Sequence, residues 1–276
     1  MQDAHVIIDD FTASFTQLPS EVSRLSYFAV FDGHGGVRAS KYAAQNLHLN
    51  LTRNFPKGEV SNMEKAIKKC LLMTFKQTDE GFLKQASSQK PAWKDGSTAT
   101  CVLLVDRDLY VANLGDSRAI LCRFSETSGK LTSMPLMKEH NPTQYDERMR
   151  IQKAGGTVRD GRVMGMLEVS RSIGDGQYKH CGVISVPDVR RCPLTSNDRY
   201  SVQNTSRTCV QMGSFSWLAM DYSKSFPRKK PSSLLQQYSR MRPSLQGWGK
   251  LHRMCGLKLP VTDWLMRLSA GALLTT

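Results

Sequence analysis

The stretch FAVFDGHGG, residues 28–36, passes from an apolar, aromatic segment directly into a carboxylate, a histidine and three glycines. An apolar segment of this kind before a turn-forming cluster predicts a strand. A lone Asp-Gly after a strand commonly serves only as a turn. Here His34 and two further glycines follow Asp32, so the backbone can approach a ligand closely and its carbonyl groups can face a cation. The stretch therefore also makes Asp32 a candidate ligand at the mouth of a strand.

Hydrophobic patterns on both sides of this stretch predict a mixed fold. Strand-like segments occupy residues 1–9, 25–31, 98–105, 108–113, 117–122, 158–163 and 182–186. Apolar residues at helical spacing occupy residues 37–50, 61–86 and 143–154. Because this order is not a regular alternation of strand and helix, it favours an α+β architecture in which helices cover antiparallel sheets.

Length and composition set the class of protein. The chain has 276 residues, 40% of them hydrophobic, which is enough for a sizeable core. It has no apolar run of about 18 residues and no secretory leader pattern, so we expect no membrane span. The seven cysteines show no C-x-x-C spacing, which favours reduced thiols over disulfides or a zinc site. We expect an intracellular monomer that resides in the cytoplasm, with the nucleus as an alternative.

The net charge of +14 is distributed unevenly along the chain. Residues 200–276 hold 11 Lys and Arg against 2 Asp, a net charge of +9, and residues 1–199 hold 27 basic against 22 acidic residues, a net charge of +5. The basic segment also contains three of the four tryptophans, which is one feature of a nucleic-acid interface. Its spacing is irregular and no nucleic-acid-binding motif occurs, so we predict no nucleic-acid partner.

Eight segments carry a resemblance to a known family. In chain order they are MQDAH, VFDGHGG, GSTATCVLL, VANLGDSRAIL, EHNP, RIQKAGG, LEVSRSIGD and ISVPDV. Their order and spacing resemble those of the metal-dependent serine/threonine protein phosphatases of the 2C type. The resemblance covers residues 1–199 and implies a sandwich of two antiparallel β-sheets flanked by helices.

The resemblance also implies a site with two Mn²⁺ or Mg²⁺ ions, which prefer oxygen ligands and activate a shared water. By position, Asp32 would bridge the ions, the carbonyl of Gly33 would bind one of them, and Asp3 would act through water. His34 would be the acid that protonates the leaving oxygen. Asp116 would serve a weaker third ion, with an ordinary turn residue as the alternative. The other histidines show no ligand-like pairing and are expected to have ordinary surface or satisfied core roles: His5, His48, His140, His180 and His252.

The implied activity is removal of phosphate from phosphoserine and phosphothreonine in proteins, which opposes kinase signalling. Phosphoproteins would be the substrates, and the resemblance also implies integrin-linked kinase as a partner. No stretch of the sequence can be assigned to that contact.

Two features depart from the family pattern. The family places an arginine on an opening strand before the MQDAH segment, and this chain begins at Met1 of that segment. After residue 199 the family continues with an Ala-x-Asp-Gly strand and a Gly-x-x-Asp-Asn segment, both of which supply metal ligands. Here the only carboxylates are Asp221 and Asp263, in unrelated settings. We therefore expect a fold that lacks its first and its C-terminal strands.

The genetic code suggests an origin for the segment after residue 199. When residues 217–223 are read one base earlier, their codons permit the sequence LACDGLF, which is the missing family motif. Residues 270–276 likewise permit Arg-Gly-Ser-Ala-Asp-Asn. Our hypothesis is a 2C-type domain over residues 1–199 and a frame-shifted, poorly ordered tail over residues 200–276, with an unrelated evolved tail as the alternative.

Two functions follow from these observations. The first is a metal-dependent serine/threonine protein phosphatase. The second is a catalytically impaired fragment that acts at most as a partner-binding module, since two metal-ligand carboxylates of the family are absent. We expect little metal binding and low turnover for this chain.

Overall fold

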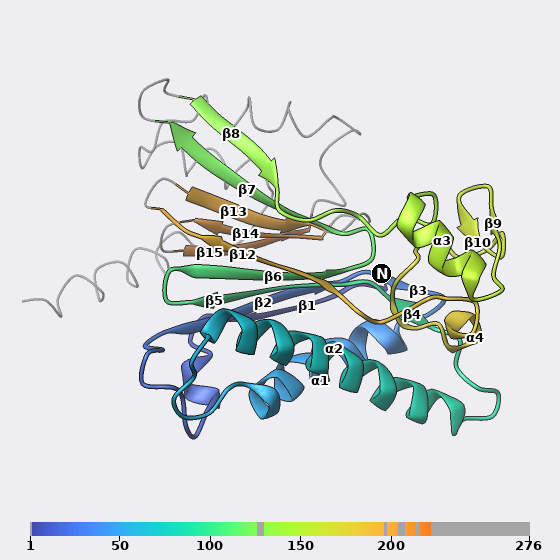
Figure 1. The fold of residues 1–276 in the computed structure, drawn as a ribbon, viewed down its shortest axis with the longest axis horizontal. Coiled ribbons are helices and arrows are strands. Elements are labelled where there is room, and N and C mark those ends of the chain that lie inside the picture. The colour runs from blue at the N-terminus through green and yellow to red at the C-terminus, as the bar shows by residue number, and fades with distance from the viewer. Residues whose placement is uncertain (1, 126–129, 196–197, 204–207, 214–215, 222–276) are drawn as a thin grey trace, which may run out of the picture. The chain divides into compact units, whose positions relative to one another are not determined.

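The structure is a computed structural model, and it describes residues 2–125, 130–195, 198–203, 208–213 and 216–221 (Figure 1). These residues belong to one compact unit, residues 1–223. Among them, no helix combines the length and the apolar character that a membrane span requires. The cysteines whose side chains are described carry free thiols: Cys70, Cys101, Cys181 and Cys192.

Two five-stranded antiparallel sheets form the framework (Figure 1). The first sheet has the order β1-β2-β5-β6-β12, and the second has the order β15-β14-β13-β7-β8. The strands of the first are β1 (Ala4–Ile8), β2 (Leu25–Phe31), β5 (Ala99–Val105), β6 (Asp108–Leu114) and β12 (Asp188–Pro193). Those of the second are β7 (Arg118–Ser125), β8 (Lys130–Pro135), β13 (Asp198–Gln203), β14 (Thr208–Gly213) and β15 (Ser216–Asp221).

Strand β2 explains why the opening stretch is apolar without alternation. All seven of its residues are buried. Tyr27 and Phe31 pack into a core beneath the helices, whereas Phe28 and Val30 pack into a second core with residues of β7 such as Leu121. A strand that is covered on both faces needs apolar residues at every position.

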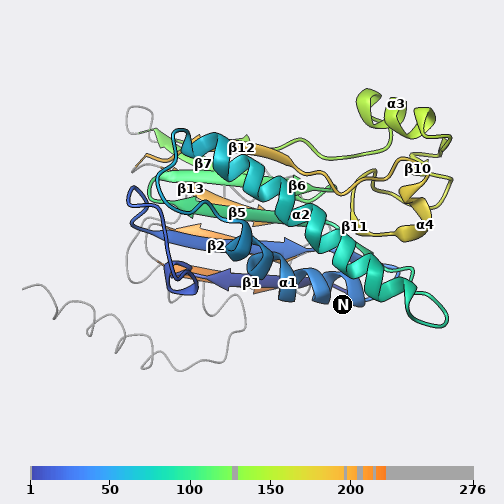
Figure 2. The same ribbon diagram turned by 60° about the horizontal axis from the view of Figure 1, so that its bottom comes forward.

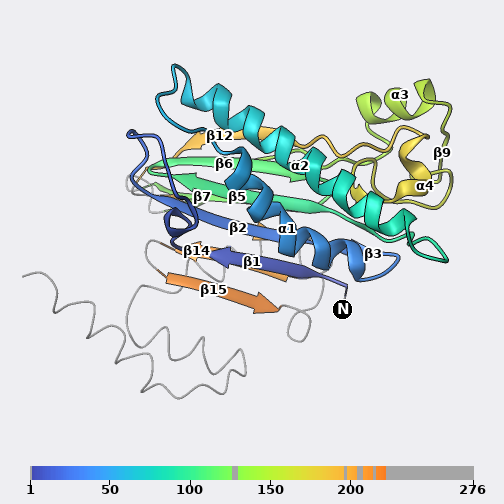
Figure 3. The ribbon, with the colours of Figure 1, turned by 90° about the horizontal axis from the view of Figure 1, so that it is seen from below.

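Two long helices cover the outer face of the first sheet (Figures 2 and 3). They are α1 (Arg38–Asn54) and α2 (Met63–Ser87). Helix α2 begins at an N-cap, because the Asn62 side chain accepts a hydrogen bond from the backbone N–H of Lys65 at 2.9 Å. The predicted α+β architecture of packed antiparallel sheets with flanking helices is confirmed.

Smaller elements gather at one end of the sheets (Figure 1). They comprise α3 (Tyr145–Lys153), α4 (Gly176–Lys179), the hairpin of β9 (Val158–Arg159) and β10 (Arg162–Val163), and a sheet of β3 (Gly33–His34), β4 (Gly96–Ser97) and β11 (Ile173–Gly174). A 3₁₀ turn, Thr12–Ser14, precedes β2. The α3 region has its own small core, which includes Ile151 and Val163.

Two predicted strand segments take a more specific form in the structure. The segment 158–163 contains two short strands joined as a hairpin, because Asp160 and Gly161 both adopt positive φ angles and reverse the chain. The strand expected over residues 182–186 begins instead at Asp188. Pro187 precedes it and has no N–H to donate, so regular pairing with β6 starts after the proline.

Strand pairing in the second sheet continues beyond residue 199 in the described residues. The backbone of β13 pairs with β7, and β14 and β15 follow it in the same sheet. Ladder hydrogen bonds use backbone groups that every residue except proline carries, so an edge strand can be extended without the family sequence. The division at residue 199 stays a prediction, and residues 222–276 of the tail lie outside the described residues.

Candidate functional site

One cleft of about 330 Å³ brings together three of the predicted site residues, Asp32, His34 and Asp116. It lies where β2 and β6 end, beside the small elements around α3 and α4. The rest of its lining consists of Gly35, Lys94, Thr98, Arg162, Met166, Leu167, Glu168, Val169, Asp175 and Tyr178.

Thr98 connects the turns that carry two of the cleft carboxylates, Asp32 and Asp116. Its hydroxyl oxygen accepts a hydrogen bond from the N–H of Asp32 at 3.2 Å, and its own N–H donates to the carbonyl of Asp32 at 2.9 Å. The same hydroxyl lies 3.0 Å from the hydroxyl of Ser117, next to Asp116. Gly115 adopts a φ of +109°, and the Thr98 side chain fills the space that a Cβ there would need. Thr98 therefore fixes the separation of the two acidic turns.

Gly33 lies against the segment that carries Asp3. A Cβ on Gly33 would collide with the carbonyl oxygen of Gln2. The hydroxyl of Ser40, in α1, donates to that carbonyl at 2.5 Å and holds it in place. Only glycine fits here, because any side chain would displace Gln2, the residue that precedes Asp3 and the strand β1.

Asp3 is placed near Asp32 by the pairing of strands β1 and β2, although it does not line the cleft. Ala4 pairs with Phe31, so Asp3 and Asp32 are the next residues along the two antiparallel strands. Asp3 is half-buried and is not among the described residues that line the cleft. Its predicted contact through water stays a prediction.

His34 is held by a carboxylate that the sequence did not single out. The Nε2 atom of His34 lies 2.6 Å from Oδ2 of Asp175, and these side chains are 31% and 2% exposed. Asp175 adopts left-handed backbone angles, φ 51° and ψ 42°, and its N–H donates to the carbonyl of Asp95 at 3.0 Å. A Cβ on Gly96 would collide with both Nε2 and Oδ2. The pair thus requires glycine at position 96.

The charges of the cleft perturb two of its groups. Burial lowers the pKa of His34, but the hydrogen bond to Asp175 and the charges of Asp175, Asp32 and Asp116 outweigh it, so the pKa is raised. Burial raises the pKa of Asp116, and the charges of Asp32 and Glu139 add to this effect. The cleft is therefore a region of negative potential that favours a protonated imidazole.

The described residues offer few donors for a metal pair. The carboxylates of Asp32 and Asp116 and the carbonyl of Gly33 are hard oxygen ligands of the kind that Mg²⁺ and Mn²⁺ prefer. However, no group of three or more His, Cys, Asp or Glu side chains in the described part of the chain lies close enough together to hold a metal ion. These donors have the right chemistry, and in the described part of the chain they make up only part of the ligand set that two ions require.

Comparison with known proteins places the chain in a family. Residues 1–202 match the family model described as Protein phosphatase 2C. The chain belongs to the protein phosphatase 2C family. It is 74% identical over 200 residues to the integrin-linked kinase-associated serine/threonine phosphatase 2C of Rattus norvegicus, and 74% identical to the protein of that name from Homo sapiens. Each match covers 72% of this chain and 51% of the relative, so the chain spans about half the length of these curated relatives.

A solved structure supports the fold. The serine-threonine phosphatase 2C from Toxoplasma gondii superimposes with a TM-score of 0.57 at 20% sequence identity. The match covers 72% of this chain and 76% of that one. At this identity the likeness concerns the fold alone.

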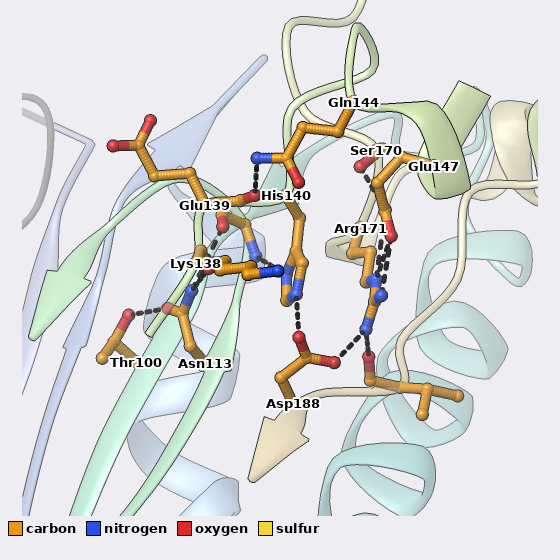
Figure 4. A network of polar contacts seen from close by, with 12 residues as sticks. Thr100, Asn113, Lys138, Glu139, His140, Gln144, Glu147, Ser170, Arg171 and Asp188 are labelled. Atoms are coloured by element: carbon orange, nitrogen blue, oxygen red, sulfur yellow. Dashed lines mark hydrogen bonds and ion pairs between the residues drawn. The ribbon is translucent and has the colours of Figure 1, made fainter. Parts of the chain in front are cut away.

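In this phosphatase 2C chain, His140 is a buried histidine with a structural role, and the sequence did not indicate its specific contacts (Figure 4). Its backbone N–H donates to the carbonyl of Gly115 at 2.8 Å, and its Nδ1 accepts from the N–H of Gly115 at 3.1 Å. Since Nδ1 is an acceptor, Nε2 carries the proton, and it lies 3.2 Å from Oδ2 of Asp188. His140 is 2% exposed and clamps the residue before Asp116. The EHNP segment was one signal of the resemblance, but it did not reveal this role.

Glu147 forms the centre of an adjoining network (Figure 4). Its carboxylate accepts from Arg150 at 2.8 and 2.9 Å, from Arg171 at 2.6 Å and from the hydroxyl of Ser170 at 2.5 Å. Arg171 also donates to Asp188 at 2.9 Å. Burial raises the pKa of Glu147, but these hydrogen bonds and the charge of Arg171 hold it well below its usual range. The network ties α3 to β12 and, through Asp188, to His140.

Proposed function

We propose that the cleft is the phosphoester site of a metal-dependent serine/threonine protein phosphatase. The observation that carries the proposal is the pair of His34 and Asp175 beside the carboxylates Asp32 and Asp116, all on one cleft. Relatives at 74% identity are named serine/threonine phosphatases, which supports phosphoproteins as the substrate class. The proposed reaction is hydrolysis of phosphoserine and phosphothreonine by water.

His34 is the proposed general acid. The raised pKa keeps its ring protonated to higher pH than in an unperturbed histidine, so a proton is available for the leaving seryl or threonyl oxygen. Asp175 engages Nε2. Nδ1 is therefore the ring nitrogen that would release the proton. Asp175 is a positioning residue in this scheme, because it fixes the ring and stabilises its charged form.

A second candidate function follows from the donor set. The described residues fall short of what two Mn²⁺ or Mg²⁺ ions require, so we propose as the alternative a catalytically impaired phosphatase that acts by binding partners. The relatives' name makes integrin-linked kinase a proposed partner. A monomeric state and cytoplasmic residence, with the nucleus as an alternative, also stay proposals.

The proposed two-part organisation has its own support. The family match ends at residue 202, close to the division predicted at residues 199 and 200. Sequencing of the transcript tests the frame-shift hypothesis. Stop codons in the earlier frame, or an earlier frame that does not encode the Asp-Gly motif, would contradict it.

Purified full chain, assayed with Mn²⁺ and a phosphothreonine peptide, separates the two functions. A phosphatase should show metal-dependent release of phosphate that is lost in Asp32→Asn and kept in Asp146→Asn, which changes an exposed carboxylate on α3. An impaired fragment should release no phosphate above the Asp32→Asn background. Turnover that survives Asp32→Asn would overturn the assignment of the cleft.

A further inference from the structure

A second pocket lies at the opposite end of the first sheet from the cleft. Thr98 and Asp116, next to one end of β5 and β6, line the cleft, whereas Val105 and Asp108, at the other end, line a pocket of about 410 Å³. Seven strand residues separate the two sites, a distance of about 20 Å. The pocket is lined by Glu21, Val22, Asn62, Met63, Glu64, Val105, Asp106, Asp108, Tyr110 and Arg191.

The rim of this pocket has an excess of negative charge. Four carboxylates line it, those of Glu21, Glu64, Asp106 and Asp108, against the single guanidinium of Arg191. Arg191 pairs with Glu64 at 3.0 Å and with Asp108 at 2.9 Å. Two carboxylates therefore lack a basic partner among the described residues, in a chain whose net charge is +14.

The two remaining carboxylates, those of Glu21 and Asp106, differ in how firmly they are held. Oδ1 of Asp106 accepts hydrogen bonds from the N–H of Ser23 at 3.1 Å, the hydroxyl of Ser23 at 2.6 Å and the N–H of Arg24 at 2.9 Å. Neutral donors fix this carboxylate in place without removing its charge. Glu21 is exposed and can adjust its position. A fixed and an adjustable carboxylate together suit a cation that arrives from solvent.

Tyr110 gives an independent sign of a ligand. The residue as a whole is only 2% exposed, yet it lines the pocket, and no described residue forms a hydrogen bond with its hydroxyl. Burial raises the pKa of Tyr110, the charge of Arg191 lowers it, and the charges of Asp108 and Glu64 raise it. The phenol oxygen therefore lies near the charged groups of the pocket. The hydroxyl oxygen is not among the fully buried polar atoms that lack a partner, so it is open to the pocket, where a ligand that donates a hydrogen bond can reach it.

The shape of the pocket indicates what kind of cation it accepts. Val22, Val105 and Tyr110 are buried and form apolar walls, while the carboxylates stand at the rim. Arginine and lysine combine an aliphatic stem with a charged, hydrogen-bond-donating head. The described acidic side chains do not cluster closely enough to hold a metal ion. We propose that this pocket binds an arginine or lysine side chain from a basic segment of a partner protein.

The test uses the full chain and a fluorescently labelled peptide with two arginines between neutral residues, followed by fluorescence anisotropy. A peptide with citrulline in place of arginine keeps the shape and removes the charge. We expect saturable binding of the arginine peptide only. Glu21→Gln and Tyr110→Phe should each weaken it about fivefold, since each removes one contact to a charged group.

Glu80→Gln is the matched control, because Glu80 is an exposed glutamate further along α2 with a 62% exposed side chain. It should leave the dissociation constant unchanged. Equal weakening by Glu21→Gln and Glu80→Gln would show general charge attraction and overturn the proposal. The proposal would also be overturned if Glu21→Gln and Tyr110→Phe, with unchanged melting temperatures, bound the arginine peptide as tightly as the wild type. Phosphatase activity does not enter the measurement, so its outcome is independent of the proposed function.

Discussion

The Nε2 atom of His34 lies 2.6 Å from Oδ2 of Asp175, although the two residues are 141 positions apart in the sequence. Two buried aspartates on other elements hold the segment of Asp175. Asp79, on α2, accepts from the N–H of Gly174 at 2.8 Å, and the carbonyl of Asp95 accepts from the N–H of Asp175. The position of the carboxylate is therefore set by the helical layer as well as by its own turn.

Gly96→Ala should disrupt this pair. The added methyl would collide with His34 Nε2 and with the carboxylate of Asp175, so we expect a loss of about 1–3 kcal/mol in unfolding free energy, measured by urea denaturation. Gly176→Ala is the control, because its methyl would meet only Leu83, at 3.1 Å. Equal losses in the two variants would contradict the close packing of Gly96 on the pair.

His140→Ala should loosen the turn before Asp116. It removes the acceptor of the buried Gly115 N–H, which costs about 1–3 kcal/mol. Hydrogen exchange of the Gly115 amide should accelerate, as measured by NMR. His5→Ala changes an exposed histidine on β1 and should leave that amide unaffected. Unchanged protection of Gly115 in His140→Ala would refute the clamp.

Glu147→Gln should be strongly destabilising. It leaves the guanidinium groups of Arg150 and Arg171 without their shared counter-charge, and we expect a loss of about 3 kcal/mol in unfolding free energy. The matched control is Glu168→Gln, which breaks an exposed pair with Arg162 and should cost less than about 1 kcal/mol. Denaturant unfolding compares the two, and similar losses would mean that the Glu147 network contributes little.

The contribution of Glu147 should depend on pH in a defined direction. Its folded-state pKa lies below the unfolded value of about 4.3, so its stabilisation is full above that value and declines as the pH falls. The stability difference between wild type and Glu147→Gln should thus be constant near pH 6 and shrink between about pH 5 and pH 3. Unfolding midpoints at several pH values measure this difference.

The contribution of Asp188 to stability should also decline as the pH falls, because the hydrogen bond from His140 and the charge of Arg171 lower its pKa to about 2. Part of the acid sensitivity should therefore remain in Glu147→Gln. A stability difference that grows as the pH falls would contradict both assignments.

Local sequence chemistry predicted much of the fold. The apolar run of β2 and the helical periodicity of α1 and α2 are properties of contiguous residues, and each appears in the structure close to its expected bounds. Turns were harder to predict from pattern alone. Residues 158–163 have β-prone composition, but the positive φ angles of Asp160 and Gly161 turn them into a hairpin.

The roles of the site residues stay predictions. The resemblance of ordered motifs pointed to Asp32, His34 and Asp116, and all three line one cleft. Asp3 comes next to Asp32 by strand register but is absent from the described lining. No periodicity or spacing indicated that His140 clamps Gly115, because that contact depends on how β6 and a distant loop meet.

The sequence by itself determined the β2 strand, the covering helices and the family to which residues 1–202 belong, because these depend on short segments and their order. Only the tertiary structure decided that Asp175 holds His34, that Glu147 joins α3 to β12, and that an acidic pocket surrounds Tyr110. Such contacts join residues far apart in the chain. They form because burial brings charged and polar groups together, where each must find a partner.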